Sequence, residues 1–392
     1  MNIILFDTEK RTNLFPLTFT RPIADLRVGI LKLSEKWEKY LKGTVSFKTA
    51  DYLSTKYPTI LSDKNYWVDS SIIVNRILAD EIDTLKERQV LVFRDTVIAY
   101  ISDIQLEDFD AYEKVETQSN PIQINYPWDI FSNNHRAIEE DFELVTHGRS
   151  SVDISSTNTV IGDSTRLFVE EGVDIECAIL NTKTGPIYIG KNSVILEGSL
   201  VRGALAMNEG SLLKMGTKVY GATTMGKFSK LGGEVNNSVV YDFSNKGHEG
   251  FLGNSVLGEW CNIGADTNNS NLKNNYQPVK LWNYNAERFI PTGLQFCGLI
   301  MGDHSKTGIN TMFNTGTVVG VAANVFGADY PRNFIPSFSW GITRNQTFKM
   351  NKVLEMAEAM MGRRNLSLTS SDVAILEEVF NQTKKYRTWE KA

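Results

Sequence analysis

His248 is the residue of this chain whose type and setting best suit acid–base chemistry. It is one of four histidines, and it follows a segment with five lysines in an otherwise acidic protein. An imidazole titrates near neutral pH and can take a proton from an attacking nucleophile, while lysines hold anions. The five lysines are Lys214, Lys218, Lys227, Lys230 and Lys246. The cluster predicts a general base beside an anion-binding surface; the alternative is a loop histidine among solvated charges.

Composition and charge exclude several classes of protein. The 392 residues are 42% hydrophobic and 22% charged, as in soluble globular domains, and the length suggests two or three of them. Lysine and arginine number 41 against 46 acidic residues, so the formal net charge is −5. With no overall positive field, we expect neither nucleic acid nor a membrane among the partners.

Cysteine usage and the first residues indicate a reducing compartment. Cys177, Cys261 and Cys297 are widely spaced and include no CxxC pair, which argues against a disulfide framework or a structural zinc site. The segment Met1 to Asp7 lacks the basic region and long apolar stretch of a signal peptide. No run approaches the ~20 apolar residues of a membrane span. We expect a cytoplasmic protein.

A six-residue repeat surrounds the lysine segment and predicts how it is held. Every sixth residue is apolar over eight steps, at Ile189, Ile195, Val201, Met207, Leu213, Val219, Met225 and Leu231. Six of the eight residues four places further on are Ser or Thr, at Ser193, Ser199, Ser211, Thr217, Thr223 and Ser229. Three such hexads make one triangular coil of a parallel β-helix, with the aliphatic residue inside and the small residue near a corner.

The same column extends the predicted solenoid over residues 151–330. It recurs earlier at Ile161, Leu167, Val173 and Ile179, and later at Phe251, Leu257, Ile263, Met301, Thr307, Phe313, Val319 and Val325. Two stretches break the six-residue register, at about 242–250 and 268–298. Since a break in register must leave the prism, both are expected to be loops.

The two flanks have other patterns. Residues 1–150 alternate short apolar runs with helix-like stretches, which indicates an α/β domain. The runs are 2–6, 71–78, 90–93 and 97–101, and the helix-like stretches are 28–41 and 134–141. Residues 331–392 predict a helical tail over 346–361 and from Thr369 to about Tyr386, where 369–372 resembles a capping box. We expect this tail to cover the solenoid end.

The segment around the histidine resembles a known enzyme family. Gly247-His248, Leu252-Gly253, the run Asn262 to Ala265, and Asn271 match, without a gap, a pattern of the bacterial enzymes that combine N-acetylglucosamine-1-phosphate uridyltransferase with glucosamine-1-phosphate acetyltransferase. The variant branch with a shortened N-terminal domain is more similar. The resemblance implies a left-handed β-helix, a homotrimer, and acetyl-CoA as the acyl donor.

The resemblance also assigns roles. His248 would take a proton from the sugar amine as it attacks the thioester, and a backbone N–H near Ala265 would hold the oxyanion. Lys218 stands where the family has a phosphate-binding arginine, and Asn236 stands where it has a lysine. The substrate groove would be lined by Asn236, Phe251, Asn262, Ala265 and Asn271.

In the N-terminal domain, segment 14–22 (LFPLTFTRP) resembles the one that follows the phosphate loop of sugar-1-phosphate nucleotidyltransferases. Residues 7–13 hold none of the glycines with which that loop cradles a triphosphate. Arg11 and Arg21 are the candidates to contact nucleotide phosphates, and Asp69 is the candidate ligand of Mg²⁺. The stretch 126–129 resembles the connector to the solenoid in the variant branch.

The sequence patterns therefore predict an α/β domain, a hexapeptide β-helix and C-terminal helices, and the resemblance implies that the first is nucleotidyltransferase-like and the second left-handed. The expected reactions are acetyl transfer to glucosamine-1-phosphate and uridylyl transfer from UTP to N-acetylglucosamine-1-phosphate. Two alternatives stay open. The N-terminal domain acts on another sugar phosphate while the solenoid serves for oligomerisation, or the protein is a non-catalytic scaffold or regulator.

Overall fold

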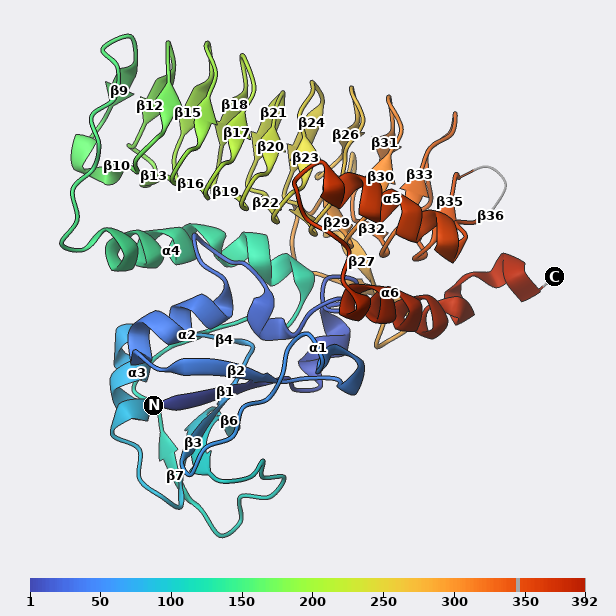
Figure 1. Ribbon diagram of the computed structural model, residues 1–392. Helices are drawn as coiled ribbons and strands as arrows, with labels where there is room; N and C mark the ends of the chain where they lie inside the picture. The colour runs from blue at the N-terminus through green and yellow to red at the C-terminus, as the bar shows by residue number, and fades with distance from the viewer. Residues whose placement is uncertain (343–345, 392) are drawn as a thin grey trace.

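A parallel solenoid sets the long axis of the molecule, and an α/β domain lies against its side (Figure 1). The computed structural model describes residues 1–342 and 346–391. The solenoid is a left-handed parallel β-helix of about ten turns whose strands form three flat faces. The parallel β-helix predicted from the hexads and the fold class implied by the resemblance are confirmed. In the part of the chain that the structure describes, no helix is long and apolar enough to cross a membrane.

The three faces are built from very short strands. Face one is a nine-stranded sheet of β10 (Leu167–Val169), β13 (Ile187–Ile189), β16 (Leu205–Met207), β19 (Thr223–Met225), β22 (Val239–Val240), β25 (Val256–Leu257), β29 (Leu299–Met301), β32 (Thr317–Val319) and β34 (Phe334–Ile335). Face two holds β9 (Thr159–Ile161), β12 (Ile179–Asn181), β15 (Leu200–Arg202), β18 (Lys218–Tyr220), β21 (Glu234–Asn236) and β24 (Phe251–Gly253), followed by the pair β26 (Asn268–Asn269) and β31 (Met312–Phe313). Face three holds β11 (Asp174–Ile175), β14 (Val194–Ile195), β17 (Leu212–Leu213), β20 (Lys230–Leu231) and β23 (Asn245–Lys246), then β30 (Lys306–Thr307), β33 (Asn324–Val325), β35 (Ser339–Trp340) and β36 (Gln346–Thr347).

The hexad residues form the interior, as predicted. All eight apolar residues from Ile189 to Leu231 are buried in one continuous core. The Ser and Thr column is buried too, because its hydroxyls donate to carbonyls at the corners: Ser199 Oγ donates to Leu196 O at 2.7 Å, and Ser229 Oγ to Gly226 O at 2.8 Å. These bonds satisfy backbone acceptors that a turn would otherwise leave unpaired.

The register predicted at the two ends of the column was partly wrong. Ile179 is 39% exposed, and Leu180 points inward instead. Leu180 pairs with Val201, so this rung is longer than three hexads. On the later side Phe251 is partly exposed and Leu252 is buried, because Leu252 pairs with Val235 across a rung shorter than three hexads.

Of the two predicted loops, only one leaves the prism. Segment 242–250 was wrongly predicted as a loop: β23 pairs with β20, so this part of the chain forms a shortened rung. The chain does leave the prism after β26. It forms a hairpin of β27 (Lys280–Asn283) and β28 (Arg288–Pro291) and returns at β29.

The N-terminal domain is built on a six-stranded mixed sheet. Its order is β2 (Thr44–Lys48), β1 (Asn2–Phe6), β3 (Asn65–Asp69), β6 (Thr96–Ser102), β5 (Gln89–Phe93) and β7 (Glu113–Glu116). The small pair β4 (Ile72–Ile73) and β8 (Ile122–Gln123) and the helices α1 (Lys10–Asn13), α2 (Leu33–Leu41) and α3 (Arg76–Asp83) complete it. Helix α2 begins five residues later than the predicted 28, since residues 27 and 32 form a β-bridge that holds 28–31 in a turn.

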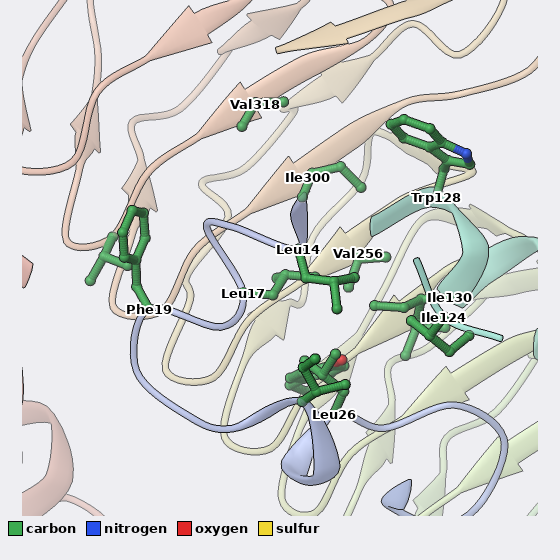
Figure 2. Close-up of a cluster of buried hydrophobic side chains, with 14 of the residues drawn as sticks. Leu14, Leu17, Phe19, Leu26, Ile124, Trp128, Ile130, Val256, Ile300 and Val318 are labelled. Carbon is green, nitrogen blue, oxygen red and sulfur yellow. The ribbon is translucent and has the colours of Figure 1, made fainter. Parts of the chain in front are cut away.

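A shared core joins this domain to the solenoid. Figure 2 shows Leu14, Leu17 and Leu26 of the N-terminal domain gathered with Val256 and Ile300 of the nine-stranded face. The connecting helix α4 (Pro127–Thr146) lies along the same face, and its Asn134 Nδ2 donates to Ala222 O at 3.0 Å. The N-terminal domain is therefore docked on the solenoid rather than tethered to it.

Two helices end the chain: α5 (Met350–Gly362) and α6 (Ser370–Gln382). The predicted capping box is confirmed, since Thr369 and Asp372 cap each other's backbone N–H groups. Helix α5 runs along the flank of the solenoid in Figure 1, and α6 lies between solenoid and N-terminal domain. At the solenoid end, strand β36 pairs with β35, and the tail after α6 reaches this edge: Trp389 Nε1 donates to Thr347 Oγ1 at 2.9 Å.

Candidate active site

His248 lies exposed at the corner where face three turns into face two, between β23 and β24. Neighbouring rungs fix the backbone of this corner: Glu234 N donates to Gly250 O at 3.3 Å, and Asp266 N donates to Glu249 O at 3.0 Å. Gly233 has a φ of +71°, and a Cβ there would lie 2.9 Å from the carbonyl oxygen of His248. The glycine therefore allows the corner of His248 to stack closely on the previous rung.

Lys218 shares the outer surface next to this corner. Strand pairing places Lys218, Glu234 and Phe251 in one row across face two, with their neighbours in each strand pointing inward. The Lys218 Nζ is 3.7 Å from Glu249 Oε2, and both side chains are largely exposed. Such an exposed pair contributes little stability, so the ammonium can exchange the carboxylate for a substrate anion.

Asn236 lies in the adjacent row of face two, beside Gly253. A Cβ on Gly253 would lie 2.7 Å from Asn271 Nδ2 and 2.5 Å from the ring of Phe251, so this glycine makes room for both. Asn271 Nδ2 donates to Asn254 Oδ1 at 2.8 Å. Three of the five predicted groove residues, Asn236, Phe251 and Asn271, thus meet on one surface, and Lys218 lies in the same row as Phe251.

Ala265 lies at the next corner along the solenoid, and Asn262 lies on face three. Asn262 bridges Asn245 and Lys306, and its side chain is exposed. The Ala265 carbonyl accepts from Asn310 N at 2.8 Å. Among the described residues no acceptor receives a hydrogen bond from the Ala265 N–H, so this donor is available to a ligand oxyanion.

In the N-terminal domain, Asp69 ends β3 at the edge where β1 also ends. Asp69 is fully buried; its Oδ2 accepts from Lys10 Nζ at 2.9 Å and its Oδ1 accepts from Ser71 N at 2.8 Å. Across the described ranges, no three His, Cys, Asp or Glu side chains form a metal-binding group. The lysine neutralises the one carboxylate that was predicted to hold Mg²⁺, so the residues present do not fit that ion.

The two predicted phosphate ligands are engaged by protein groups. Arg11 donates to Thr18 O at 2.7 Å and to the Tyr52 hydroxyl at 2.6 Å. Arg21 is 2% exposed and forms ion pairs with Glu259 at 2.7 Å and with Asp303. Both of these acids belong to the solenoid, so Arg21 holds the two domains together.

Comparisons with known proteins place the first 150 residues beside a family of transferases. Residues 3–150 match the family model of sugar nucleotidyl transferases. The chain is 24% identical over 216 residues to the bifunctional protein GlmU of Methanococcus vannielii, a match that covers 53% of this chain and 42% of that protein. It is 34% identical over 93 residues to a bifunctional sugar-1-phosphate nucleotidylyltransferase/acetyltransferase of Sulfurisphaera tokodaii. That match covers 24% of this chain and 23% of that protein.

Residues 3–150 are thus similar to sugar nucleotidyl transferases, and parts of the chain are similar to bifunctional sugar-1-phosphate transferases. A further relative is the GlmU of Methanocaldococcus jannaschii, 37% identical over 87 residues that make up 22% of this chain and 21% of that protein. The matches thus span less than half the length of these relatives. The polySia-specific acetyltransferase NeuO is a solved structure with 14% identity and a TM-score of 0.24, covering 48% of this chain and 80% of that one.

Sequence reasoning missed two groups of residues in this protein. It did not anticipate Lys10 on Asp69, or the solenoid acids Glu259 and Asp303 that hold Arg21. For the contact of Lys10 with Asp69, the available signal was the absence of glycine in 7–13, because the short helix α1 replaces an open loop there. The second had no local signal, because its partners are far apart in sequence.

Proposed function

We propose that the solenoid transfers the acetyl group of acetyl-CoA to the amine of glucosamine-1-phosphate, with His248 as general base. The observation that carries this proposal is the exposed imidazole on a corner fixed by glycines, beside the ammonium of Lys218 and the unused N–H of Ala265. Acyl transfer to an amino sugar phosphate requires three groups: a base, a cation that binds the phosphate, and an N–H that donates a hydrogen bond to the oxyanion.

The reaction divides among these groups. The sugar nitrogen attacks the thioester carbonyl carbon while His248 takes one of its protons. The carbonyl oxygen becomes an oxyanion near the Ala265 N–H. Collapse of this intermediate breaks the C–S bond, and the departing coenzyme A thiolate takes the proton from His248, so that coenzyme A leaves as the free thiol and the imidazole is neutral again. Lys218 binds the sugar phosphate. The amides of Asn236, Asn262 and Asn271 and the ring of Phe251 line the groove.

Thiol release is the direct test of acetyl transfer. The purified protein is incubated with acetyl-CoA and glucosamine-1-phosphate, and free coenzyme A is measured. The His248→Ala variant is expected to lose about 100-fold or more in rate, the usual contribution of a positioned base. The His135→Ala variant alters an exposed histidine of α4 and serves as the matched control. Thiol release that is undiminished in His248→Ala would overturn the mechanism.

We also propose that the N-terminal domain transfers a uridylyl group from UTP to N-acetylglucosamine-1-phosphate, and that the protein assembles as a homotrimer. Its match to the sugar nucleotidyl transferase model supports this activity class. Pyrophosphate release from UTP and N-acetylglucosamine-1-phosphate, with and without Mg²⁺, tests it, and light scattering tests the trimer.

The Lys10–Asp69 ion pair favours a second candidate for this domain. With its predicted metal ligand neutralised and Arg21 engaged at the interface, the N-terminal domain has a structural role against the solenoid and no transferase activity of its own. Absence of pyrophosphate release under all conditions, with thiol release intact, would support this candidate.

A further inference from the structure

The interior of the prism carries a lysine in an aliphatic column. On face three, the inward residues of successive rungs are Ile175, Ile195, Leu213, Leu231 and then Lys246. Lys246 is 2% exposed, and Ile263 follows it on the next rung. A leucine would fill such a position without the cost of burying an ammonium group, so the lysine calls for a reason other than packing.

The contacts of the Lys246 ammonium supply that reason. Its Nζ donates to the carbonyl oxygen of His248 at 2.5 Å and to that of Gly232 at 2.9 Å. Among the described residues it has no carboxylate within ion-pair distance. Burial lowers the pKa of Lys246 to about 8, against the opposing effect of Glu249. The lysine therefore donates its hydrogen bonds to the backbone of two stacked corners, one of which carries His248.

We propose that Lys246 is a positioning residue for His248, holding the backbone of the catalytic corner from inside the prism. The inference rests on the acetyl transfer proposed above. A hydrogen bond to the His248 carbonyl fixes the peptide that follows the imidazole, and the second bond ties that peptide to Gly232 on the rung before. The outer side of the same turn is held by Glu249, which faces Lys218.

The functional consequence follows from the precision that proton transfer requires. A general base works within hydrogen-bond reach of its proton, and a displacement of about 1 Å by a residue remote from the reacting atoms can cost about 100-fold in rate. Without Lys246, the two carbonyls lose their donors inside an apolar prism. The turn then gains freedom in the part that aims the imidazole, while the groove that binds acetyl-CoA keeps its residues.

The test compares two variants that keep the interior filled. Lys246→Met replaces the ammonium with an apolar group of similar length, and Lys246→Gln retains N–H donors. Leu231→Met, one rung away in the same column, is the matched control for repacking. We expect Lys246→Met to lower kcat for thiol release about 10- to 100-fold with KM for acetyl-CoA within about twofold, and Lys246→Gln to recover part of that loss.

A second measurement does not depend on activity. Amide hydrogen exchange of the peptide 247–252, read by mass spectrometry, is expected to speed up in Lys246→Met and to stay unchanged in Leu231→Met. Unchanged hydrogen exchange together with an unchanged kcat in Lys246→Met would overturn the inference. A loss of kcat in Leu231→Met as large as that in Lys246→Met would overturn it too. If the unaltered protein releases no thiol, the acetyl-transfer proposal fails, and the exchange comparison alone decides whether Lys246 orders the corner.

Discussion

The guanidinium of Arg21 donates a hydrogen bond to the carboxylate of Asp303, although the two residues are 282 positions apart. Arg21 belongs to the N-terminal domain and Asp303 to a solenoid corner, and both are buried. Glu259, from the rung before, and Asp25 complete the acids around the same guanidinium. The Arg21 guanidinium also lies 5.4 Å from the ring of Tyr241, a residue of the shared apolar core, so charge pairing and apolar burial join the two domains at one interface.

Removing this arginine is expected to weaken the interface strongly. Arg21→Met leaves the buried Asp303 and the partly buried Glu259 without their main counter-ion, which costs about 3–5 kcal/mol of folding stability. Urea denaturation measures this loss. Arg76→Ala breaks an exposed pair with Asp80 and is the control, with an expected change within about 0.5 kcal/mol. Equal effects of the two substitutions would contradict the assignment of Arg21 to the domain interface.

Replacing the glycine that packs against the corner of His248 with alanine is expected to lower folding stability more than the same change at another glycine with a positive φ. Gly233 (φ +71°) faces the His248 carbonyl, whereas Gly216 (φ +66°) has open space where a Cβ would go. Gly216→Ala should lose about 1 kcal/mol from backbone strain. In Gly233→Ala, the free energy of unfolding should fall by about 1–3 kcal/mol more, because the added methyl group overpacks the site. This variant should also release thiol more slowly. Thermal unfolding and the thiol assay compare the pair; identical losses would show that the corner is loosely packed.

Charge at Lys218 is expected to govern affinity for the sugar phosphate. Lys218→Ala removes a cation next to the His248 corner, so KM for glucosamine-1-phosphate should rise about tenfold, equivalent to ~1.4 kcal/mol. The KM for acetyl-CoA should change less. Lys191→Ala, an exposed lysine elsewhere on the solenoid, controls for net charge. A rise of the same size in Lys191→Ala would point to a diffuse charge effect.

The pH dependence of stability should reveal the buried lysine. Because burial lowers the pKa of Lys246 to about 8, the unfolded chain binds more protons than the folded one between pH 8 and the ordinary lysine range near 10.5. The free energy of unfolding contributed by Lys246 therefore rises with pH across that window, by at most about 1.4 kcal/mol per pH unit. Urea titrations of the unaltered protein and Lys246→Met at pH 7, 8, 9 and 10 give this contribution as a difference. A difference that is independent of pH would contradict the burial of a lysine charge.

Much of the fold could be predicted because its repeat is local. The inward column from Ile189 to Leu231 fixed three flat faces, since each hexad residue meets its equivalent one coil later. Prediction failed where a rung holds more or fewer residues than three hexads. As a result, Ile179 and Phe251 lie on the outer surface instead of the interior, and segment 242–250 is part of the prism instead of a loop.

The candidate site was predictable in part for a similar reason. Lys218, Asn236 and Phe251 come together because successive coils stack in register, so spacing along the chain translates into neighbouring strands. The inward direction of Lys246 follows from the length of one shortened rung, which the sequence pattern did not reveal.

The sequence by itself determined the prism, the α/β domain and the capped tail helix, because those depend on periodicity and on contacts between residues near in the chain or one coil apart. Tertiary structure alone decided that Lys10 neutralises Asp69, that Arg21 meets Asp303, and that Lys246 reaches the carbonyl of His248. A buried charge takes whichever partner the packed domains bring within a few ångströms, and no local pattern records that choice.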